Sequence, residues 1–132
     1  MIKIQEKETD QETFDFVVGK LREQGEPSMN LDGNKCLYGK PGGKRCAIGH
    51  LLGDVAISDF RVEGVENFVL TEGITVRNLG LLMDMQDAHD AAALYPMGKK
   101  WSRRCAEEMI QVASEHHLDQ SSAQAWLDNV QV

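Results

Sequence analysis

The residues whose types and spacing could support chemistry lie between positions 36 and 50, where two of the three cysteines and one histidine occur. Cys36, Cys46 and His50 could supply three ligands to Zn²⁺, which prefers thiolate and imidazole groups in a tetrahedral site. A fourth ligand would have to come from later in the chain, from His89, Cys105, His116 or His117. The segment lacks a CxxC pair, and cysteine is often buried simply as a small apolar residue. We therefore expect no cofactor, and we keep a zinc-stabilised structural domain as an alternative.

Cys46 is the best candidate for a nucleophile. It follows Arg45 at an expected helix start, and both a cationic neighbour and the helix dipole favour the reactive thiolate. No general base for Cys46 can be identified from residue spacing. His50 lies one helical turn later, and His89 offers a second imidazole. The sequence also lacks an HExxH motif, a nucleophile elbow and a dinucleotide-binding fingerprint. These observations favour a protein without catalytic activity.

His89 has a structural interpretation beside the catalytic one. It shares a predicted helix face with Leu82, which indicates a hydrogen-bonded histidine at the margin of the core. Adjacent side chains on a helix point about 100° apart, so we do not expect His89 to pair with Asp90.

Eight of the 14 cationic residues fall in two short segments. In the second segment they surround Trp101, which could stack a base or a carboxylate-bearing partner between them. We favour the alternative that Trp101 anchors its helix in the core, because it is in register with Cys105 and Met109. The cations then ring the helix start, where the helix dipole disfavours them, and this placement indicates an anionic partner. The predicted binding residues of both segments are Lys40, Lys44, Arg45, Lys99, Lys100, Arg103 and Arg104.

The first cationic segment surrounds a tight turn predicted at residues 41–43, which read PGG. The backbone amides of such a turn, next to Lys40 and Lys44, could hold a small anion. A small-ligand-binding protein or enzyme centred on residues 36–50 is therefore an alternative function. The opposing interpretation, which we favour, is a solvated β-hairpin whose lysines protect an exposed strand edge.

Length and composition indicate one soluble domain over residues 1–132, with 42% hydrophobic and 27% charged residues. The net charge of −7 argues against a general nucleic-acid coat protein. No apolar run approaches the ~18 residues that cross a bilayer, and no secretory signal opens the chain, so we expect a cytoplasmic protein without membrane contact. Exposed apolar helix faces could also pair two protomers, which keeps a homo-oligomer open.

Hydrophobic periodicity predicts a mostly helical chain. Thr9 and Glu12 form a capping box before a helix over residues 10–24, and Gly25 is its expected left-handed C-cap. A β-hairpin is expected over residues 36–46, followed by a helix that begins at Cys46. Residues 55–73 fit neither period and predict irregular structure with a short helix.

A long central helix is predicted from Thr75 until the stop signals of residues 95–98, with one face formed by Val76, Leu79, Leu82, Met83, Gln86, His89 and Ala93. The next helix carries a face of Trp101, Cys105, Met109, Val112 and Ala113. A last short helix begins at Ser121, with Gln124 completing a second capping box. The predicted fold class is α+β and predominantly helical, with four to five helices and one small β-hairpin.

Three stretches resemble small uncharacterised proteins of bacteriophages and prophages: CLY from Cys36, GKRCAIGHL from Gly43 and QDAHD from Gln86. The CxY and GxxCAxG patterns are the most specific part. The resemblance implies no activity and identifies no catalytic residue. It implies a small phage-type accessory protein that binds a macromolecular partner, such as a host or defence complex that it inhibits.

Overall fold

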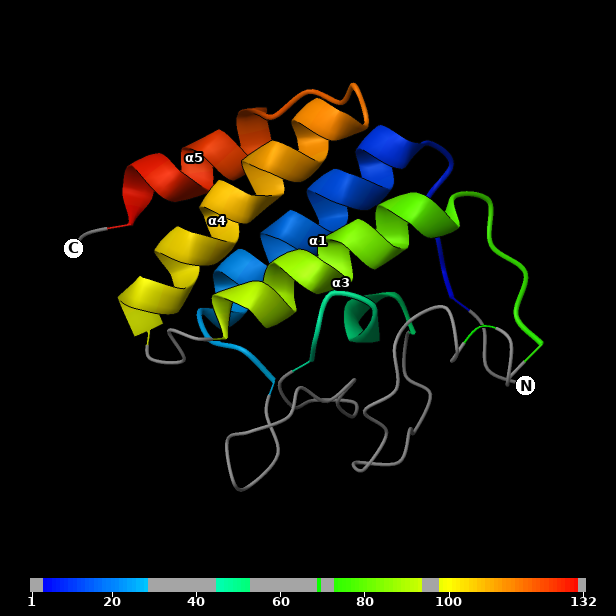
Figure 1. Ribbon diagram of the computed structural model, residues 1–132, viewed down its shortest axis with the longest axis horizontal. Helices are drawn as coiled ribbons and strands as arrows, with labels where there is room; N and C mark the ends of the chain where they lie inside the picture. Colours follow the sequence, from blue (N-terminus) through cyan, green and yellow to red (C-terminus); the bar gives the residue numbers. More distant parts are fainter. Residues whose placement is uncertain (1–3, 29–44, 53–68, 70–72, 94–97, 131–132) are drawn as a thin grey trace.

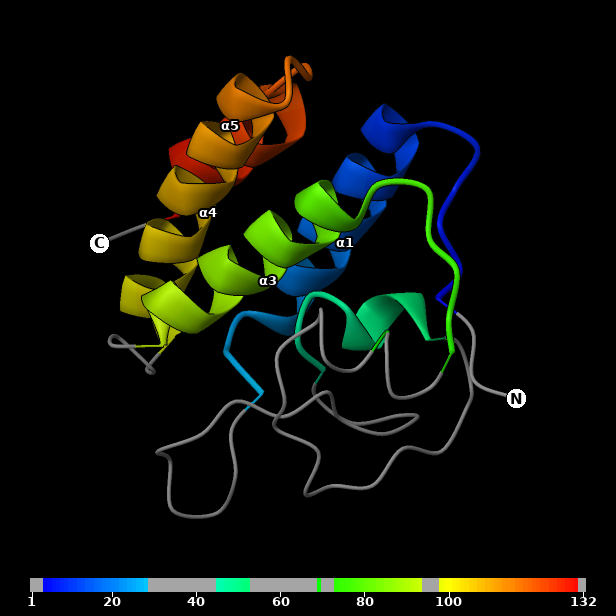
Figure 2. The ribbon, with the colours of Figure 1, turned by 45° about the vertical axis from the view of Figure 1, so that its right-hand side comes forward.

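The computed structural model describes residues 4–28, 45–52, 69, 73–93 and 98–130. These residues form four α-helices, α1 (Asp10–Gln24), α3 (Leu79–Ala92), α4 (Gly98–Glu115) and α5 (Ser121–Asn129), and one 3-10 turn, η1 (Gly49–Leu51). The helices gather in one bundle, and η1 lies on the side of the bundle away from α5 (Figures 1 and 2). The prediction of a predominantly helical chain is confirmed. The expected β-hairpin and nearly all of residues 55–73 lie outside the described residues.

Helix α1 has the predicted bounds because both of its ends are determined locally. The Thr9 hydroxyl oxygen accepts the Glu12 backbone N–H at 3.1 Å, and its own hydrogen reaches the Glu12 carboxylate at 3.0 Å. Gly25 ends the helix at φ 71°, where glycine lacks the steric penalty of other residues, and its N–H donates to the Leu21 carbonyl. The buried face consists of Phe14, Val17, Val18 and Leu21, which recur at helical spacing, together with Thr13.

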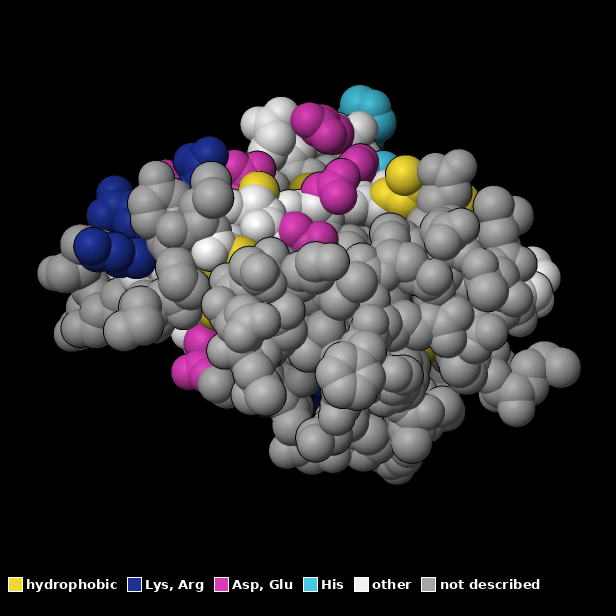
Figure 3. Space-filling model, turned by 60° about the horizontal axis from the view of Figure 1, so that its bottom comes forward, with side chains coloured by type: hydrophobic (Ala, Val, Ile, Leu, Met, Phe, Trp, Pro, Cys, Tyr) yellow, Lys and Arg dark blue, Asp and Glu magenta, His cyan; other side chains and the backbone are white. Residues whose placement is uncertain are grey.

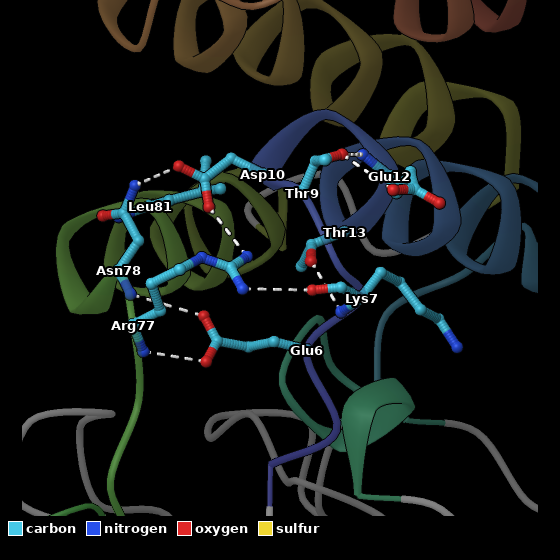
Figure 4. Close-up of polar contacts among 9 residues, drawn as sticks. All are labelled: Glu6, Lys7, Thr9, Asp10, Glu12, Thr13, Arg77, Asn78 and Leu81. Carbon is cyan, nitrogen blue, oxygen red and sulfur yellow. Dashed lines mark hydrogen bonds and ion pairs between the residues drawn. The ribbon is translucent and has the colours of Figure 1, made fainter.

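Helix α3 begins at Leu79, four residues later than Thr75, so the predicted start was wrong. Its N-cap is Asn78, whose side-chain oxygen accepts the Leu81 N–H at 3.0 Å. The backbone N–H groups of Arg77 and Asn78 donate to the Glu6 carboxylate, at 2.8 and 3.3 Å, and these bonds anchor the residues that precede the helix (Figure 4). The predicted face was also partly wrong, because Val76, Leu79, Met83 and Ala93 are only half-buried. The buried set is Leu81, Leu82, Met85, Gln86, Ala88, His89 and Ala92.

The start of α3 is also tied to the start of α1 through Asp10 (Figure 4). One carboxylate oxygen of Asp10 accepts the Asn78 side-chain amide at 2.8 Å, and the other pairs with the Arg77 guanidinium at 3.0 Å. These two bonds hold the pKa of Asp10 below its usual range, and the bond from Asn78 has the larger effect. Arg77 also donates to the Lys7 carbonyl at 3.2 Å, so the residues before α1 are held at the same junction.

Helix α4 is the central packing element, in contact with α1, α3 and α5. Its predicted face is confirmed, because Trp101, Cys105, Met109, Val112 and Ala113 are all buried. Beyond α4 the chain turns at His117, whose φ of 56° is the left-handed conformation common after helix ends. The Leu118 N–H bonds the Ala113 carbonyl at 2.8 Å, and this capping arrangement reverses the chain into α5.

Helix α5 begins at Ser121 as predicted, but its capping box does not form. Gln120 is the N-cap and makes no side-chain capping bond, while the Ser121 N–H donates to the Asp119 carboxylate at 2.7 Å. The connection is fixed to α1 instead. Gln11 exchanges two hydrogen bonds with the backbone of Asp119, at 3.0 and 2.7 Å, and Ser122 donates to Asp15 at 2.7 Å.

The helix expected after Cys46 was wrong in extent, because the described chain makes only the single turn η1. The N–H of Ile48 donates to the Gln86 side chain at 3.1 Å, and the N–H of Gly49 reaches the Cys46 sulfur at 3.4 Å. The His50 N–H makes one helical bond to the Cys46 carbonyl, and the next two bonds, from Leu51 to Ile48 and from Leu52 to Gly49, have 3-10 spacing. The apolar side chains of this segment are nevertheless all buried, namely Ala47, Ile48, Leu51 and Leu52.

Candidate functional site

A layer of polar side chains joins residues 45–50 to the end of α1. Gln24, the last residue of α1, makes four hydrogen bonds there. Its amide nitrogen donates to the carbonyls of Glu26 and Arg45, at 2.6 and 2.9 Å. Its oxygen accepts from the Arg45 N–H at 2.8 Å and from the His50 ring at 3.0 Å. Gln24 thus holds the backbone of this segment against the end of α1.

The same segment is joined to α3 by Gln86. The Gln86 side-chain oxygen accepts the Ile48 N–H at 3.1 Å, and its nitrogen donates to the Asp90 carboxylate at 2.9 Å. That carboxylate oxygen also lies 2.9 Å from Nδ1 of His89. The prediction that His89 and Asp90 do not pair was therefore wrong. Gln86, one turn earlier, holds the Asp90 carboxylate toward the imidazole and overcomes the divergence of adjacent side chains.

Both nitrogens of His89 are occupied. Nε2 accepts the backbone N–H of Ser28 at 3.1 Å, so it carries no proton, and Nδ1 is the protonated nitrogen that donates to Asp90. The ring is fully buried and meets Trp101 edge-on, with 5.7 Å between ring centroids. An imidazole with no available nitrogen and no solvent access cannot exchange protons with a substrate. The geometry favours the structural interpretation of His89, within the core rather than at its margin.

His50 is a half-buried imidazole beside a cation. Because Gln24 presents an oxygen to it, Nε2 of His50 is the donor of that bond. Burial, followed by the positive charge of Arg45, lowers the pKa of His50 to about 4 from 6.5. The ring is therefore neutral at neutral pH.

This lowered pKa makes stability depend on pH. Between pH 6.5 and 4 the unfolded chain binds a proton at His50 that the folded chain does not, so stability falls as the pH falls through this window. We expect His50 to contribute a loss of about 2 kcal/mol from pH 7 to pH 4, reduced from the full shift because the ring is partly exposed. Urea unfolding of the wild type and of His50→Gln at both pH values isolates this contribution. Equal losses in the two proteins would contradict it.

Cys46 does not have the environment of a reactive thiol. It is fully buried, and burial raises its pKa to about 12, so the sulfur stays protonated at neutral pH. Its sulfur accepts from Gly49, whereas His50 bonds Gln24, so these two side chains are not brought together as an acid–base pair. Burial likewise raises the pKa of Cys105. The contacts of Cys46 favour a packed thiol over a nucleophile.

The zinc prediction stays a prediction. Cys36 lies outside the described residues, and within the described part no three His, Cys, Asp or Glu side chains gather as a metal site. His116, one of the candidate fourth ligands, bonds Asp84 through Nε2 at 2.7 Å and so joins the end of α4 to α3.

The predicted basic residues separate into two groups. Arg45 is only 8% exposed, and its guanidinium donates to the Gly49 carbonyl at 2.8 Å, so it serves the fold rather than an outer surface. Lys40 and Lys44 lie outside the described residues. The other group lies on α4, where Lys100, Arg103 and Arg104 are exposed and where Lys99 occupies the first turn; we call Lys100, Arg103 and Arg104 the basic surface.

On the face of the molecule that Figure 3 shows, the described basic and acidic side chains are largely separated. In Figure 3 the Lys and Arg side chains gather at the left end of the molecule, where Figure 1 places the first turns of α4, and most Asp and Glu side chains of that view lie to their right. Arg104 pairs with Glu108 of its own helix at 2.9 Å. In the described part of the chain, Lys100 and Arg103 form no ion pair. Their charges remain available to a partner.

The role of Gln24 was not predicted, and that of Gln86 was predicted only in part. Gln86 fell on the predicted apolar face of α3, and a polar residue on such a face is a signal for a buried hydrogen bond. Gln24 carried no signal, because a glutamine at a helix end is ordinary and its partners lie 21 and 26 residues away.

Comparison of the chain with protein-family models, with curated proteins and with solved structures finds no match. Among the helices that the structure describes, none is both long enough and apolar enough to cross a membrane.

Proposed function

We propose that this protein acts by binding a macromolecular partner, without chemistry of its own, and that the basic surface of α4 contacts an anionic patch on that partner. The observation that carries the proposal is the exposure of Lys100, Arg103 and Arg104 on consecutive turns at the start of a helix. Lys100 lies in the first turn of α4, where the helix dipole disfavours a cation, so its presence does not serve the stability of the helix. A cation that costs stability in the free protein is expected to serve a contact.

The charges of the protein fit this function in a second way. The chain carries a net charge of −7, so a local cluster of cations orients it toward an anionic patch while the rest of its surface is repelled. The resemblance to phage accessory proteins suggests a host or defence complex as the partner. We also propose that binding inhibits this complex.

The alternative of a small anionic ligand at residues 36–50 receives no support from the described contacts. Its only described cation is Arg45, which is buried, and the neighbouring imidazole of His50 is neutral. We therefore place the contact on α4.

The test is a charge reversal with a matched control. Lys100→Glu with Arg103→Glu removes the basic surface, whereas Lys20→Glu with Arg22→Glu makes the same change of charge on exposed positions of α1. Each protein is immobilised, exposed to a bacterial lysate at 0.15 M salt, and its captured proteins are quantified by mass spectrometry. We expect at least a ~10-fold loss of specific partners for the α4 variant alone, which corresponds to about 1.4 kcal/mol. Equal capture by both variants, or equal loss, would count against the proposal.

A further inference from the structure

Along the outer face of α4, basic residues come first and acidic residues follow. Successive residues of a helix turn by about 100°, which places every exposed position of α4 from residue 100 onward within one arc of roughly 140°. Along this arc the first two turns are basic and the following turns are acidic or neutral. The exposed residues are Lys100, Arg103, Arg104, Glu107, Gln111, Ser114 and Glu115, and the half-buried Glu108 lies at the edge of the arc.

This order is the reverse of what a free helix prefers. α4 has no acidic residue in its first turn and no basic residue in its last turn. α1 in the same protein follows the usual preference, with Asp10 and Glu12 in its first turn and Arg22 in its last. The single ion pair on the face, between Arg104 and Glu108, has the cation on the N-terminal side, which is the weaker order within a helix. The order of charges along α4 therefore does not stabilise the free helix, and it indicates a contact with another molecule.

We propose that the outer face of α4 pairs with the same face of a second copy of this chain, in antiparallel orientation. A two-fold axis between residues 105 and 106 places Arg103 beside Glu107 of the second copy and Arg104 beside its Glu108, because residues on the same edge of the arc meet in an antiparallel pair. Because such an axis repeats each contact, four ion pairs form from these residues. Lys100 then lies opposite Gln111, and the overlap extends about 17 Å along the helices.

In the antiparallel arrangement the basic first turns of each helix lie beside Glu107 and Glu108 of the other, so opposite charges meet there. Arg104 and Glu108 are 49% and 30% exposed in the free protein, so both can change partner without leaving a buried charge behind. The interface is narrow and polar, and we therefore expect a reversible dimer rather than a permanent one.

The net charge of −7 on each copy opposes association at long range. At about 0.1 M ionic strength the screening length is roughly 10 Å, which weakens this repulsion but leaves ion pairs in contact largely intact. At 1 M the length falls to about 3 Å, and the pairs are screened as well. We expect dimerisation at the first salt concentration and its loss at the second.

The test is sedimentation equilibrium of the full chain over a concentration series at 0.1 M salt, with charge-swapped variants. Arg103→Glu with Arg104→Glu makes the face acidic, and Glu107→Arg with Glu108→Arg makes it basic. Each variant alone should dimerise at least ~10-fold more weakly than the wild type, because like charges now face each other. An equimolar mixture of the two should form a heterodimer.

The decisive variant carries all four substitutions in one chain. It reverses the order of charges along α4 but keeps the face complementary to itself, so its dimerisation should return to within ~3-fold of the wild type. Lys20→Glu with Arg22→Glu is the control for net charge and should leave dimerisation unchanged. Far-UV circular dichroism and the fluorescence of Trp101 and Trp126, both buried, establish that each variant is folded.

A wild type that stays monomeric up to millimolar concentration would overturn this inference, and so would a quadruple variant as weak as the double variants. The outcome is separate from that of the proposed function. Capture of an anionic partner needs positive charge at residues 103 and 104, so the quadruple variant should not recover it even where the dimer is restored.

Discussion

Replacement of Trp101 by alanine is expected to lower the free energy of unfolding by about 3–5 kcal/mol, the range measured for buried aromatic residues in other proteins. Trp101 is fully buried on α4, the helix that contacts α1, α3 and α5. Its ring lies 5.8 Å from that of Trp126 on α5 and 5.7 Å from that of His89 on α3. A cavity at this point removes contacts from three helices at once.

The measurement is chemical denaturation followed by circular dichroism, which does not depend on the fluorophore that is removed. Because a small domain has only about 5–15 kcal/mol of stability, Trp101→Ala is expected to be partly unfolded at 37 °C. Ser114→Ala, an exposed substitution on the same helix, serves as the control and should change the free energy by less than ~0.5 kcal/mol. A loss below ~1 kcal/mol for Trp101→Ala would show that this residue does not anchor the bundle.

Substitution of His89 by leucine is expected to cost about 2–3 kcal/mol, although leucine is of similar size and more apolar. The buried N–H of Ser28 loses its acceptor, which costs roughly 1–3 kcal/mol where water cannot enter. The edge-on contact with Trp101 is lost as well, worth roughly 0.5–1.5 kcal/mol. The lost hydrogen bond from Ser28 to His89 thus outweighs the stability gained from the more hydrophobic leucine side chain.

His89→Gln is the informative comparison, because glutamine can place an acceptor near the position of Nε2 and should recover part of the loss. Asp90→Ala removes the other partner, whose side chain is 41% exposed, and should cost less than ~1 kcal/mol because water replaces it. Urea denaturation and amide hydrogen exchange at Ser28 report both effects. A His89→Leu protein as stable as the wild type would contradict the structural role that we assign to this histidine.

Local signals in the sequence explain which parts of the fold were predictable. Both ends of α1 were correct because Thr9, Glu12 and Gly25 act on backbone groups within a few residues of themselves. The start of α3 was missed because the residues before it are held by a distant side chain. The carboxylate that accepts the Arg77 backbone N–H belongs to Glu6, 71 residues away. No periodicity reports a hydrogen bond of that separation.

The candidate site was predictable to the extent that charge and exposure follow from helix position. Lys100, Arg103 and Arg104 were expected on the outer side of their helix, because Trp101 and Cys105 take the inner side, and they are exposed there. Arg45 was expected in the same role but is buried by its bond to Gly49, which depends on the turn η1. Sequence spacing alone does not distinguish an arginine that holds a turn from one that meets a partner.

The bonds from Gln11 and Asp15 to residues 119 and 122 have a consequence for the synthesis of the protein. The elements that contact α1 are η1, α4 and α5, all of which follow it in the chain, and α5 ends about 100 residues later. At roughly 5–20 residues per second, the ribosome needs about 5–20 s to deliver them after α1 has been made. Until α4 and α5 are made, the part of α1 that these two helices cover lacks its native contacts, so a nascent chain that stalls before α5 presents a target for chaperones and proteases.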